Sequence, residues 1–314
     1  MRRQELLFVV ATLVTSAFAD AQIVLGTGGS DGTYFAMAND MIKRCGATVT
    51  ISIKETEGSQ ANLQGIIDNV LTAGIVQFDV MRYYDDKDPA MARVKVLFPL
   101  NEEEIHLVAV NKATKESGFL GMSFGQKSLE IESLKDLAGK TVVAWGGSHL
   151  SAEYFQYKLK IPFNLVDLTK EKNPSAVAAK MLLDGQAHAL FAVGGAPLKW
   201  LRDEKIFGKQ FKLVPMGSDV LDQVKGTYNG ARLNYPNLAN GQVPTLSVQA
   251  LFVTRDYRTP DGAAALVKLK QCLIENIDHL RDMPGTHPKW RAVNPGLPFE
   301  RWANYQAPAR KKEF

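Results

Sequence analysis

The sequence predicts an α/β fold built as two lobes, and three observations support this fold class. Short apolar runs alternate with longer segments whose apolar residues recur at helical spacing, as in βα units with mostly parallel strands. Two extended apolar runs, near residues 105 and 248, bracket a self-contained middle portion and can each cross between lobes. The 314 residues, 46% of them hydrophobic and 22% charged, are enough for two ordinary domains.

The first lobe is expected to open with two βα units. A strand over 22–27 precedes a helix over 33–44, and an alternating strand over 49–53 precedes a helix whose apolar face is formed by Leu63, Ile66, Ile67 and Val70. Further strands are expected at 73–77 and 94–97. The apolar run 104–110 is then the first crossover.

The middle portion starts the βα alternation again after a polar stretch over 111–126. We expect a short helix at 134–140, strands at 141–144, 163–168, 189–193 and 211–215, and helices at 148–160, at 173–183 and around Trp200. The long irregular stretch 225–242 is a candidate functional loop, with Tyr235 as a candidate ligand contact.

A second crossover over 244–254 and a helix from Pro260 complete the chain. The predicted domain organisation is therefore a first lobe of residues 20–110 and 244–314 and a second lobe of residues 111–243. The two crossover strands join them, with a ligand cleft between.

Residues 1–19 have the features of a secretory signal peptide. Arg2 and Arg3 precede an apolar run over 6–14, and the small-residue site Ala17-Phe18-Ala19 follows. The run is too short to span a bilayer unaided. We therefore expect an exported, periplasmic protein, the alternative being a buried N-terminal helix.

Charge and cysteine usage narrow the function classes. Lys and Arg number 37 against 33 Asp and Glu, a formal charge of +4, and the basic residues are scattered, which argues against a nucleic-acid partner. Cys45 and Cys272 have no metal-ligand or CxxC spacing, so no metal site or cofactor is expected. They form either one disulfide or two buried thiols.

Glycine-rich and polar turns follow several of the predicted strands. The turn over 26–32 lacks the third glycine of a dinucleotide loop, because Asp31 stands there, and it leaves backbone N–H groups free for an anion such as a carboxylate. Similar turns lie at 55–59, 77–79, 146–149 and 194–197. Since ligands bind at the carboxyl ends of strands in open α/β sheets, these turns predict a small-molecule site.

Catalytic motifs are scarce. The five histidines show no HExxH pairing and there is no GxSxG elbow, so we expect no catalytic residue and no enzyme activity. His106 and His188 lie in apolar surroundings typical of hydrogen-bonded structural residues, whereas His149 lies in a glycine turn at the expected cleft.

Several of these segments together resemble one known family. Ile23-Val24-Leu25-Gly26-Thr27-Gly28-Gly29 with Tyr34, the turn 55–59 with Asn62, the segment 74–79, the segment 134–140 and the segment 193–197 are similar to the TAXI family of extracytoplasmic solute-binding proteins. The resemblance covers essentially the whole mature chain. It implies a type II periplasmic-binding-protein fold, and a partner in the membrane subunits of a tripartite ATP-independent (TRAP) transporter.

The resemblance also implies an anionic ligand, typically glutamate or a related dicarboxylate, and a set of cleft residues. The expected ligand-binding residues are Thr27, Gly28, Gly29, Tyr34, Thr56, Ser59, Asn62, Gln77, Gly147, Ser148, His149, Gly194, Gly195 and Pro197, besides Tyr235. His149 stands where relatives usually have glycine, and it should narrow the second-lobe side of the pocket. The acidic run 101–104 is more acidic than we expect of the family.

Two rival functions use the same kind of fold. An exported sensor would present the same cleft to a signalling receptor rather than to a transporter. A secreted hydrolase would need a nucleophile that no motif in this sequence supplies.

Overall fold

The computed structural model describes residues 22–30, 32–85, 87–111, 130–257 and 260–308. The expected signal peptide and nearly all of the polar stretch 111–126 lie outside these residues. Within the part of the chain that is described, no helix is long and apolar enough to cross a membrane.

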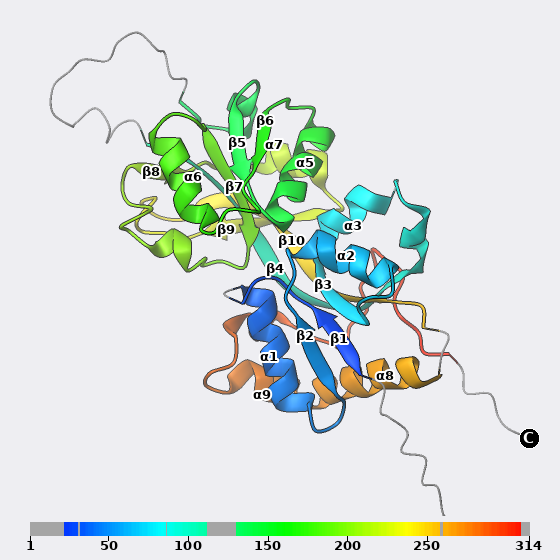
Figure 1. The fold of residues 1–314 in the computed structure, drawn as a ribbon. Helices are drawn as coiled ribbons and strands as arrows, with labels where there is room; N and C mark the ends of the chain where they lie inside the picture. Colours follow the sequence, from blue (N-terminus) through cyan, green and yellow to red (C-terminus); the bar gives the residue numbers. More distant parts are fainter. Residues whose placement is uncertain (1–21, 31, 86, 112–129, 258–259, 309–314) are drawn as a thin grey trace, which may run out of the picture.

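Two α/β lobes share one ten-stranded sheet, which confirms the predicted fold class of two lobes joined by two crossover strands (Figure 1). The strand order is β2-β1-β3-β10-β4-β7-β5-β6, with β8 paired to β4 and β9 to β10. The crossovers are β4 (Val94–Val110) and β10 (Val243–Arg255), which run antiparallel to each other through both lobes.

The first lobe is built on parallel strands β1 (Ile23–Gly26), β2 (Ile51–Lys54) and β3 (Ala73–Gln77). Its helices are α1 (Thr33–Cys45), α2 (Ser59–Ile67), α3 (Phe78–Asp85), α8 (Pro260–Glu275) and α9 (Ile277–Asp282), with short 3-10 turns at Pro89–Arg93 and Pro288–Ala292. Buried residues of α1 recur at helical spacing, and α8 packs against α1 and β1.

The second lobe is built on parallel strands β5 (Thr141–Ala144), β6 (Asn164–Asp167) and β7 (Ala189–Gly194). Its other elements are strands β8 (Phe211–Leu213) and β9 (Tyr228–Leu233), helices α5 (Gly147–Leu159), α6 (Pro174–Leu183) and α7 (Ser218–Val224), and 3-10 turns at Leu134–Leu137 and Trp200–Arg202. Asn173 caps α6 ahead of Pro174, as the sequence predicts.

A disulfide joins Cys45, the last residue of α1, to Cys272 of α8, with their Cα atoms 6.0 Å apart. Of the two alternatives that the sequence leaves open, the structure therefore shows the bridge. It fastens α8 to α1, two helices far apart in sequence.

Several predicted elements differ from the structure. The helix expected at 134–140 is only a 3-10 turn at Leu134–Leu137, and Val70, expected on the apolar face of the helix after β2, lies beyond the end of α2 and is exposed. The segments 94–97 and 104–110 are one continuous strand, β4, because the polar residues between them pair with β10. The stretch 225–242 is not wholly irregular, since it contains β9, and α7 precedes it. Around Trp200 there is only a 3-10 turn, whose indole packs against Trp145 and Phe207.

Candidate functional site

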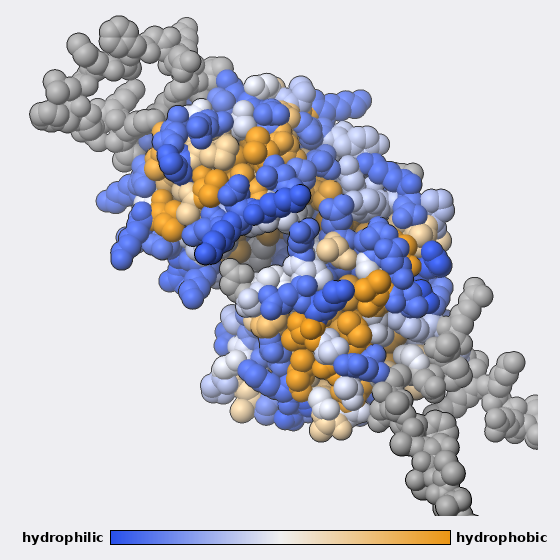
Figure 2. Space-filling model, in the orientation of Figure 1, coloured by the Kyte–Doolittle hydropathy of each residue, from blue (hydrophilic) through white to orange (hydrophobic). Residues whose placement is uncertain are grey.

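A cavity of about 230 Å³ lies between the two lobes. It is lined by Gly28, Gly32, Thr33, Tyr34, Glu57, Gly58, Ser59, Gln77 and Glu103 from the first-lobe side and by Trp145, Gly146, Gly147, Ser148, Val193, Gly194 and Leu198 from the second. The space-filling view shows an indentation between the two halves of the molecule, with a largely hydrophilic rim (Figure 2). Both lobes therefore contribute to one polar cavity, as in a cleft that encloses a small molecule.

The first turns of three helices reach the cavity. They are Thr33 and Tyr34 of α1, Ser59 of α2, and Gly147 and Ser148 of α5. The N-cap residue of each helix is a glycine (Gly32, Gly58 or Gly146), and none of the three ends has a side-chain cap among the described residues. Because the first N–H groups of a helix have no partner within it, the ends of α1 and α2 offer backbone donors and partial positive charge to an anion. At α5 the N–H groups of Ser148 and His149 already donate to the carbonyls of Trp145 and Gly146, at 3.1 Å each, so Gly147 supplies the N–H of that end.

Glu103 is a buried carboxylate in the cavity lining, with 3% of its surface exposed. Its Oε2 accepts a hydrogen bond of 2.7 Å from the Tyr34 hydroxyl, and the Gln77 side chain is a second hydrogen-bond partner. Burial raises the pKa of Glu103 to about 7, although these two hydrogen bonds act in the opposite direction. The cavity thus contains a group that changes charge near neutral pH.

Basic side chains are absent from the lining residues that the structure describes, although Lys289 lies nearby. Its Nζ is 3.1 Å from both carboxylate oxygens of Glu104 and donates to the carbonyl of Glu102 at 3.2 Å. Since Lys289 is already neutralised by Glu104, the charged side chains of the lining are the carboxylates of Glu103 and Glu57, of which Glu103 is buried and Glu57 is exposed at the rim.

The two lobes touch beside the cavity, and glycine permits this contact. A Cβ atom on Gly147 would lie 2.5 Å from Oε1 of Gln77 and 3.4 Å from Oγ of Ser59. A Cβ on Gly146 would lie 3.1 Å from the carbonyl oxygen of Glu57. The sequence 146–147 therefore lets α5 approach the first lobe closely.

Behind the cavity, a second buried carboxylate links the lobes. Asp79 of α3 accepts a 2.6 Å hydrogen bond from the Tyr228 hydroxyl of β9, and Ser151 of α5 is a further partner. Burial raises the pKa of Asp79, while these hydrogen bonds lower it. Asp79 therefore serves as an interlobe contact and lies outside the lining.

Seven of the fifteen residues proposed from the sequence line the cavity: Gly28, Tyr34, Ser59, Gln77, Gly147, Ser148 and Gly194. Three others hold its floor together without lining it. The Asn62 side-chain amide donates to the carbonyls of Thr27 (2.7 Å) and Ile75 (2.8 Å). The Thr56 hydroxyl lies 2.8 Å from Oδ1 of Asn62, which accepts from it, and 2.6 Å from the Thr27 carbonyl oxygen. Thr27, Thr56 and Asn62 thus tie the ends of β1, β2 and β3 to one another.

Three proposed residues shape the turn after β7 rather than the lining. Tyr235 is buried, and its hydroxyl accepts from the Leu198 backbone N–H at 2.6 Å and pairs with His106 Nε2 at 2.9 Å. Gly195 packs against the methylene chain of Lys289, and a cis peptide bond precedes Pro197. Tyr235 thus holds the turn after β7 through the Leu198 backbone N–H, and from this turn it is Leu198, not Gly195 or Pro197, that lines the cavity.

Gly29 and His149 are the remaining proposed residues outside the lining. Gly29 is exposed and its carbonyl accepts from Gly32 N–H. His149 follows Ser148 by one residue, about 100° around the helix, and its Nδ1 lies 3.9 Å from Glu153 Oε1 on the same helix. In this geometry the imidazole does not narrow the pocket.

Sequence reasoning missed Glu103, although the acidic run 101–104 was unexplained. In β4, Asn101, Glu103 and Ile105 are buried while Glu102 and Glu104 are half-buried. This period of two is the signal that could have found Glu103: an acid at a strand position that alternates in phase with core residues. No such signal marks Trp145, Val193 and Leu198, because in the sequence each is an apolar residue of the kind found in the hydrophobic core.

His106 and His188 are structural, as expected. His106 is fully buried against Tyr235, and burial lowers its pKa to about 3. His188 Nδ1 accepts from the Thr141 backbone N–H at 3.1 Å. Among the described residues, no group of three or more His, Cys, Asp or Glu side chains is placed to hold a metal ion.

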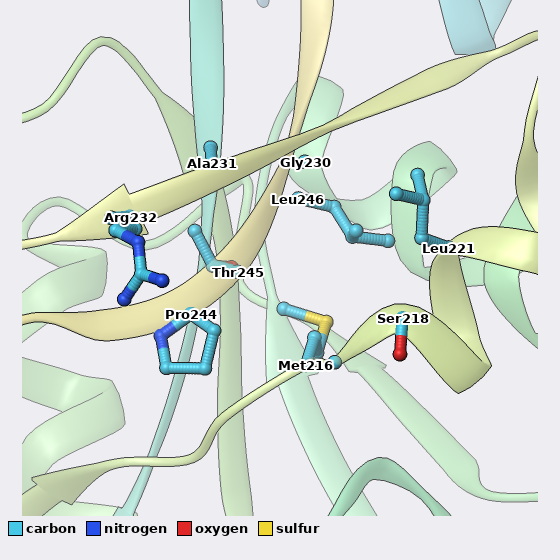
Figure 3. A pocket seen from close by; sticks show the side chains of 10 residues that line it. Met216, Ser218, Leu221, Gly230, Ala231, Arg232, Pro244, Thr245 and Leu246 are labelled. Atoms are coloured by element: carbon cyan, nitrogen blue, oxygen red, sulfur yellow. The ribbon is translucent and has the colours of Figure 1, made fainter.

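A larger hollow of about 420 Å³ lies on the second lobe, between α7, β9 and the start of β10 (Figure 3). Its lining is mostly apolar or small, with Met216, Leu221, Pro244 and Leu246, and Arg232 is its one charged side chain. It lacks the convergent polar groups of the interlobe cavity, which is therefore the better candidate for a small-molecule site.

Two α/β lobes that enclose a polar cavity at the carboxyl ends of their strands define a ligand-binding protein of the periplasmic type. The comparison of sequences agrees, since the model of the NMT1-like family matches residues 25–294. The chain belongs to the NMT1-like family, a family of periplasmic solute-binding proteins.

No curated protein sequence matches the chain. Among solved structures, a protein of Bordetella bronchiseptica RB50 is 13% identical, with a TM-score of 0.49 over 88% of this chain and 78% of that one. The GluR0 ligand-binding core with L-glutamate is 11% identical (TM-score 0.46, 82% and 95% covered), and an ancestral arginine-binding protein bound to glutamine is 15% identical (TM-score 0.45, 86% and 96% covered). At these scores the likenesses say nothing about which solute this chain binds.

Proposed function

We propose that this chain is the extracytoplasmic solute-binding subunit of a TRAP transporter of the TAXI type. After removal of residues 1–19 it would capture a small carboxylate or acidic amino acid in the periplasm by closing its lobes, and would deliver the solute to the membrane subunits. The resemblance of the motifs to the TAXI family supports the transporter assignment, and the interlobe cavity supports capture of a small molecule.

The domain boundaries proposed with this function are residues 20–110 with 244–314, and residues 111–243. The packing of α8 against α1 and β1 is consistent with placing the C-terminal segment in the first lobe. The two crossovers, β4 and β10, would then be the hinge about which the lobes rotate.

The observation that carries the ligand class is the pairing of uncapped helix ends with Glu103 in one cavity. The first-turn N–H groups of α1 and α2, with that of Gly147 in α5, suit a carboxylate, whereas Glu103, with Tyr34 and Gln77 around it, suits a positively charged amino group. Within the proposed class, an acidic amino acid therefore satisfies the cavity better than a dicarboxylate without nitrogen.

A thermal-shift screen of small carboxylates and amino acids on the mature chain tests this proposal. A solute at ~100 times its dissociation constant stabilises the folded state by roughly 2.7 kcal/mol, so a specific ligand raises the melting temperature measurably. We expect glutamate-like amino acids to give larger shifts than the corresponding dicarboxylates. Shifts with sugars or cationic solutes alone would contradict the carboxylate assignment.

Calorimetry at several pH values then tests the role of Glu103. If Glu103 must be ionised to hold an ammonium group, affinity falls as the pH drops below about 7, the pKa of Glu103, and Glu103→Gln loses this dependence. His149→Gly is the matched control, because His149 lies outside the lining. If the wild-type protein instead binds the solute more tightly at acidic pH, and His149→Gly removes this effect, the pH response would be assigned to His149.

Transport and sensing are separated by the membrane partner. Co-purification of the tagged mature chain from membranes should recover TRAP-type membrane subunits, whereas recovery of a signalling receptor would support the exported sensor. Turnover of ester, amide or glycoside substrates by the purified chain would support the hydrolase.

A further inference from the structure

A second concave surface, here called the basic pocket, lies apart from the ligand cavity at the seam between the lobes. It has a volume of about 220 Å³ and is lined by Phe78, Arg82, Tyr154, Lys158, Gln223, Val224, Lys225, Gly226, Thr227 and Arg301. Four of these residues, Arg82, Lys158, Lys225 and Arg301, are cationic, and none of the lining residues is acidic. The pocket therefore concentrates positive charge in a chain whose formal charge is only +4.

The four cations come from both sides of the seam. Arg82 lies on α3 and Arg301 on the C-terminal segment that runs past α3, whereas Lys158 lies on α5 and Lys225 directly follows α7 (Figure 1). Helix α5 packs against both α3 and α7. The fold thus brings four positive side chains, distant in sequence, to one place.

Uncharged groups hold these cations in place. The guanidinium of Arg301 lies 5.0 Å from the ring centre of Phe78 and 4.9 Å from that of Phe299, and it donates to the Gly226 carbonyl at 3.1 Å. The ammonium of Lys158 lies 5.5 Å from the ring centre of Tyr154. Such cation–π contacts orient a charge without neutralising it.

Carboxylates neutralise only part of this charge. Arg82 pairs with Asp85 at 2.8 Å, and the Glu102 carboxylate acts on Arg301 without a direct ion pair, while Lys158 and Lys225 have no ion pair with any carboxylate that the structure describes. Other basic residues do form ion pairs: Lys212 pairs with Glu130 and Glu132, and Lys289 pairs with Glu104. Clustered and unpaired cations repel one another, and an anion bound among them would relieve that repulsion.

We propose that the basic pocket binds a phosphate-like multivalent oxyanion, either free in solution or as a lipid headgroup. The volume is that of roughly seven water molecules at about 30 Å³ each, which is enough for one or two phosphate groups. Guanidinium groups match the geometry of phosphate oxygens, and lysine ammonium groups add charge without directional constraint. The bound oxyanion would contact both lobes.

Calorimetry of the mature chain with inorganic pyrophosphate, at constant ionic strength, tests the free-anion form of the proposal. We expect saturable binding that weakens at higher salt and that is at least about tenfold weaker in Lys158→Gln/Lys225→Gln. The matched control is Lys172→Gln/Lys205→Gln, which removes the same charge from exposed positions elsewhere on the second lobe. Near-ultraviolet circular dichroism of each variant verifies that the fold is retained.

Sedimentation with phosphatidylglycerol vesicles tests the headgroup form with the same variants. Binding to vesicles but not to pyrophosphate, abolished in Lys158→Gln/Lys225→Gln only, would identify the headgroup as the source. The proposal is overturned if the wild-type protein binds neither pyrophosphate nor vesicles. It is also overturned if the two double variants lose binding equally, or if both double variants bind as tightly as the wild-type protein. The last result would place pyrophosphate elsewhere, for example on the helix ends of the ligand cavity, and would leave the proposed solute-binding function untouched.

Discussion

At the scale of single residues, Glu103 couples the ligand cavity to pH. Its folded-state pKa of about 7 lies above the value of 4.5 for a free side chain, so the folded protein binds the proton more tightly than the unfolded chain. The stability that this provides is fully present below pH 4.5 and is lost as the pH rises through about 7. A difference of this size corresponds to up to about 3 kcal/mol.

Glu103→Gln should therefore be more stable than wild type at pH 8 and similar to it at pH 4.5. Glutamine keeps an oxygen for the Tyr34 hydroxyl but has no charge to bury. Urea unfolding of the ligand-free protein at the two pH values measures the difference, with the exposed Glu300→Gln as control. An equal change in stability at both pH values would contradict the role of charge burial.

Asn62 contributes to the stability of the fold through hydrogen bonds rather than through charge. Because it is fully buried and links the ends of β1, β2 and β3, Asn62→Ala leaves the Thr27 and Ile75 carbonyls without this donor. We expect a loss of about 2–4 kcal/mol in the free energy of unfolding. Asn39→Ala, which removes a single local bond to Phe35, should cost less than about 1.5 kcal/mol in the same urea titration.

At the scale of elements, the disulfide between α1 and α8 fixes the ends of the first lobe. The two cysteines are 227 residues apart in sequence, so the bridge removes many conformations from the unfolded chain. Replacing both by alanine should lower stability by about 2–4 kcal/mol. The oxidised and reduced wild-type proteins should differ similarly in thermal unfolding, and no difference would show that the bridge contributes little.

The sequence predicts regular elements better than those that tertiary contacts create. Apolar periodicity gives β1 to β3 and α1 to α2 approximately, because β1 and β3 are largely buried, β2 is a half-buried strand and each helix has one apolar face. Strand β9 contains Asn229 and Gly230, which are poor strand formers, and it exists through pairing with β10. Pairing likewise joins the two predicted parts of β4, which is why its acidic middle was not recognised as strand.

The residues of the candidate site also fall into those that the sequence predicts and those that depend on tertiary packing. Glycine turns predict where helices begin, and Gly28, Ser59, Gly147 and Ser148 accordingly line the cavity. Glu103 reaches the cavity from within a strand, and its alternation with core residues becomes visible only once the acidic middle of β4 is recognised as strand, which depends on its pairing with β10.

At the scale of the whole molecule, the two lobes share one sheet, so we expect any rotation between them to occur in β4 and β10. The pairing of these strands shifts register between Gln249 and Leu251 and again between Phe252 and Val253. Such irregularities bend and twist a strand locally. The first shift lies where β10 passes from pairing with β9 of the second lobe to pairing with β3 of the first, so hinge rotation is expected there, whereas the second shift lies within the first lobe. We expect the radius of gyration in small-angle scattering to decrease when a stabilising solute is added. A radius that stays the same at saturation would contradict closure.

Closure also depends on the absence of a side chain at Gly147. In the structure the second lobe approaches so closely that a Cβ at this position would collide with Gln77, whose side chain is itself held near Glu103 and Ser59. Gly147→Ala should therefore weaken solute binding by about tenfold, or 1.4 kcal/mol, by opposing the closed form. In the ligand-free protein the lobes can separate to relieve this collision, so its stability should fall less than its affinity for the solute, and alanine favours the helix that begins here.

Gly28→Ala is the matched control for closure, since Gly28 also lines the cavity but a Cβ there would meet no atom within 4 Å. Calorimetry should show that Gly28→Ala binds the solute more tightly than Gly147→Ala, and scattering should show that the radius of Gly147→Ala decreases less than that of wild type. Equal affinities for the two variants would mean that the lobes need not approach this closely to hold the solute. The close contact between Gly147 and Gln77 would then not be required for binding.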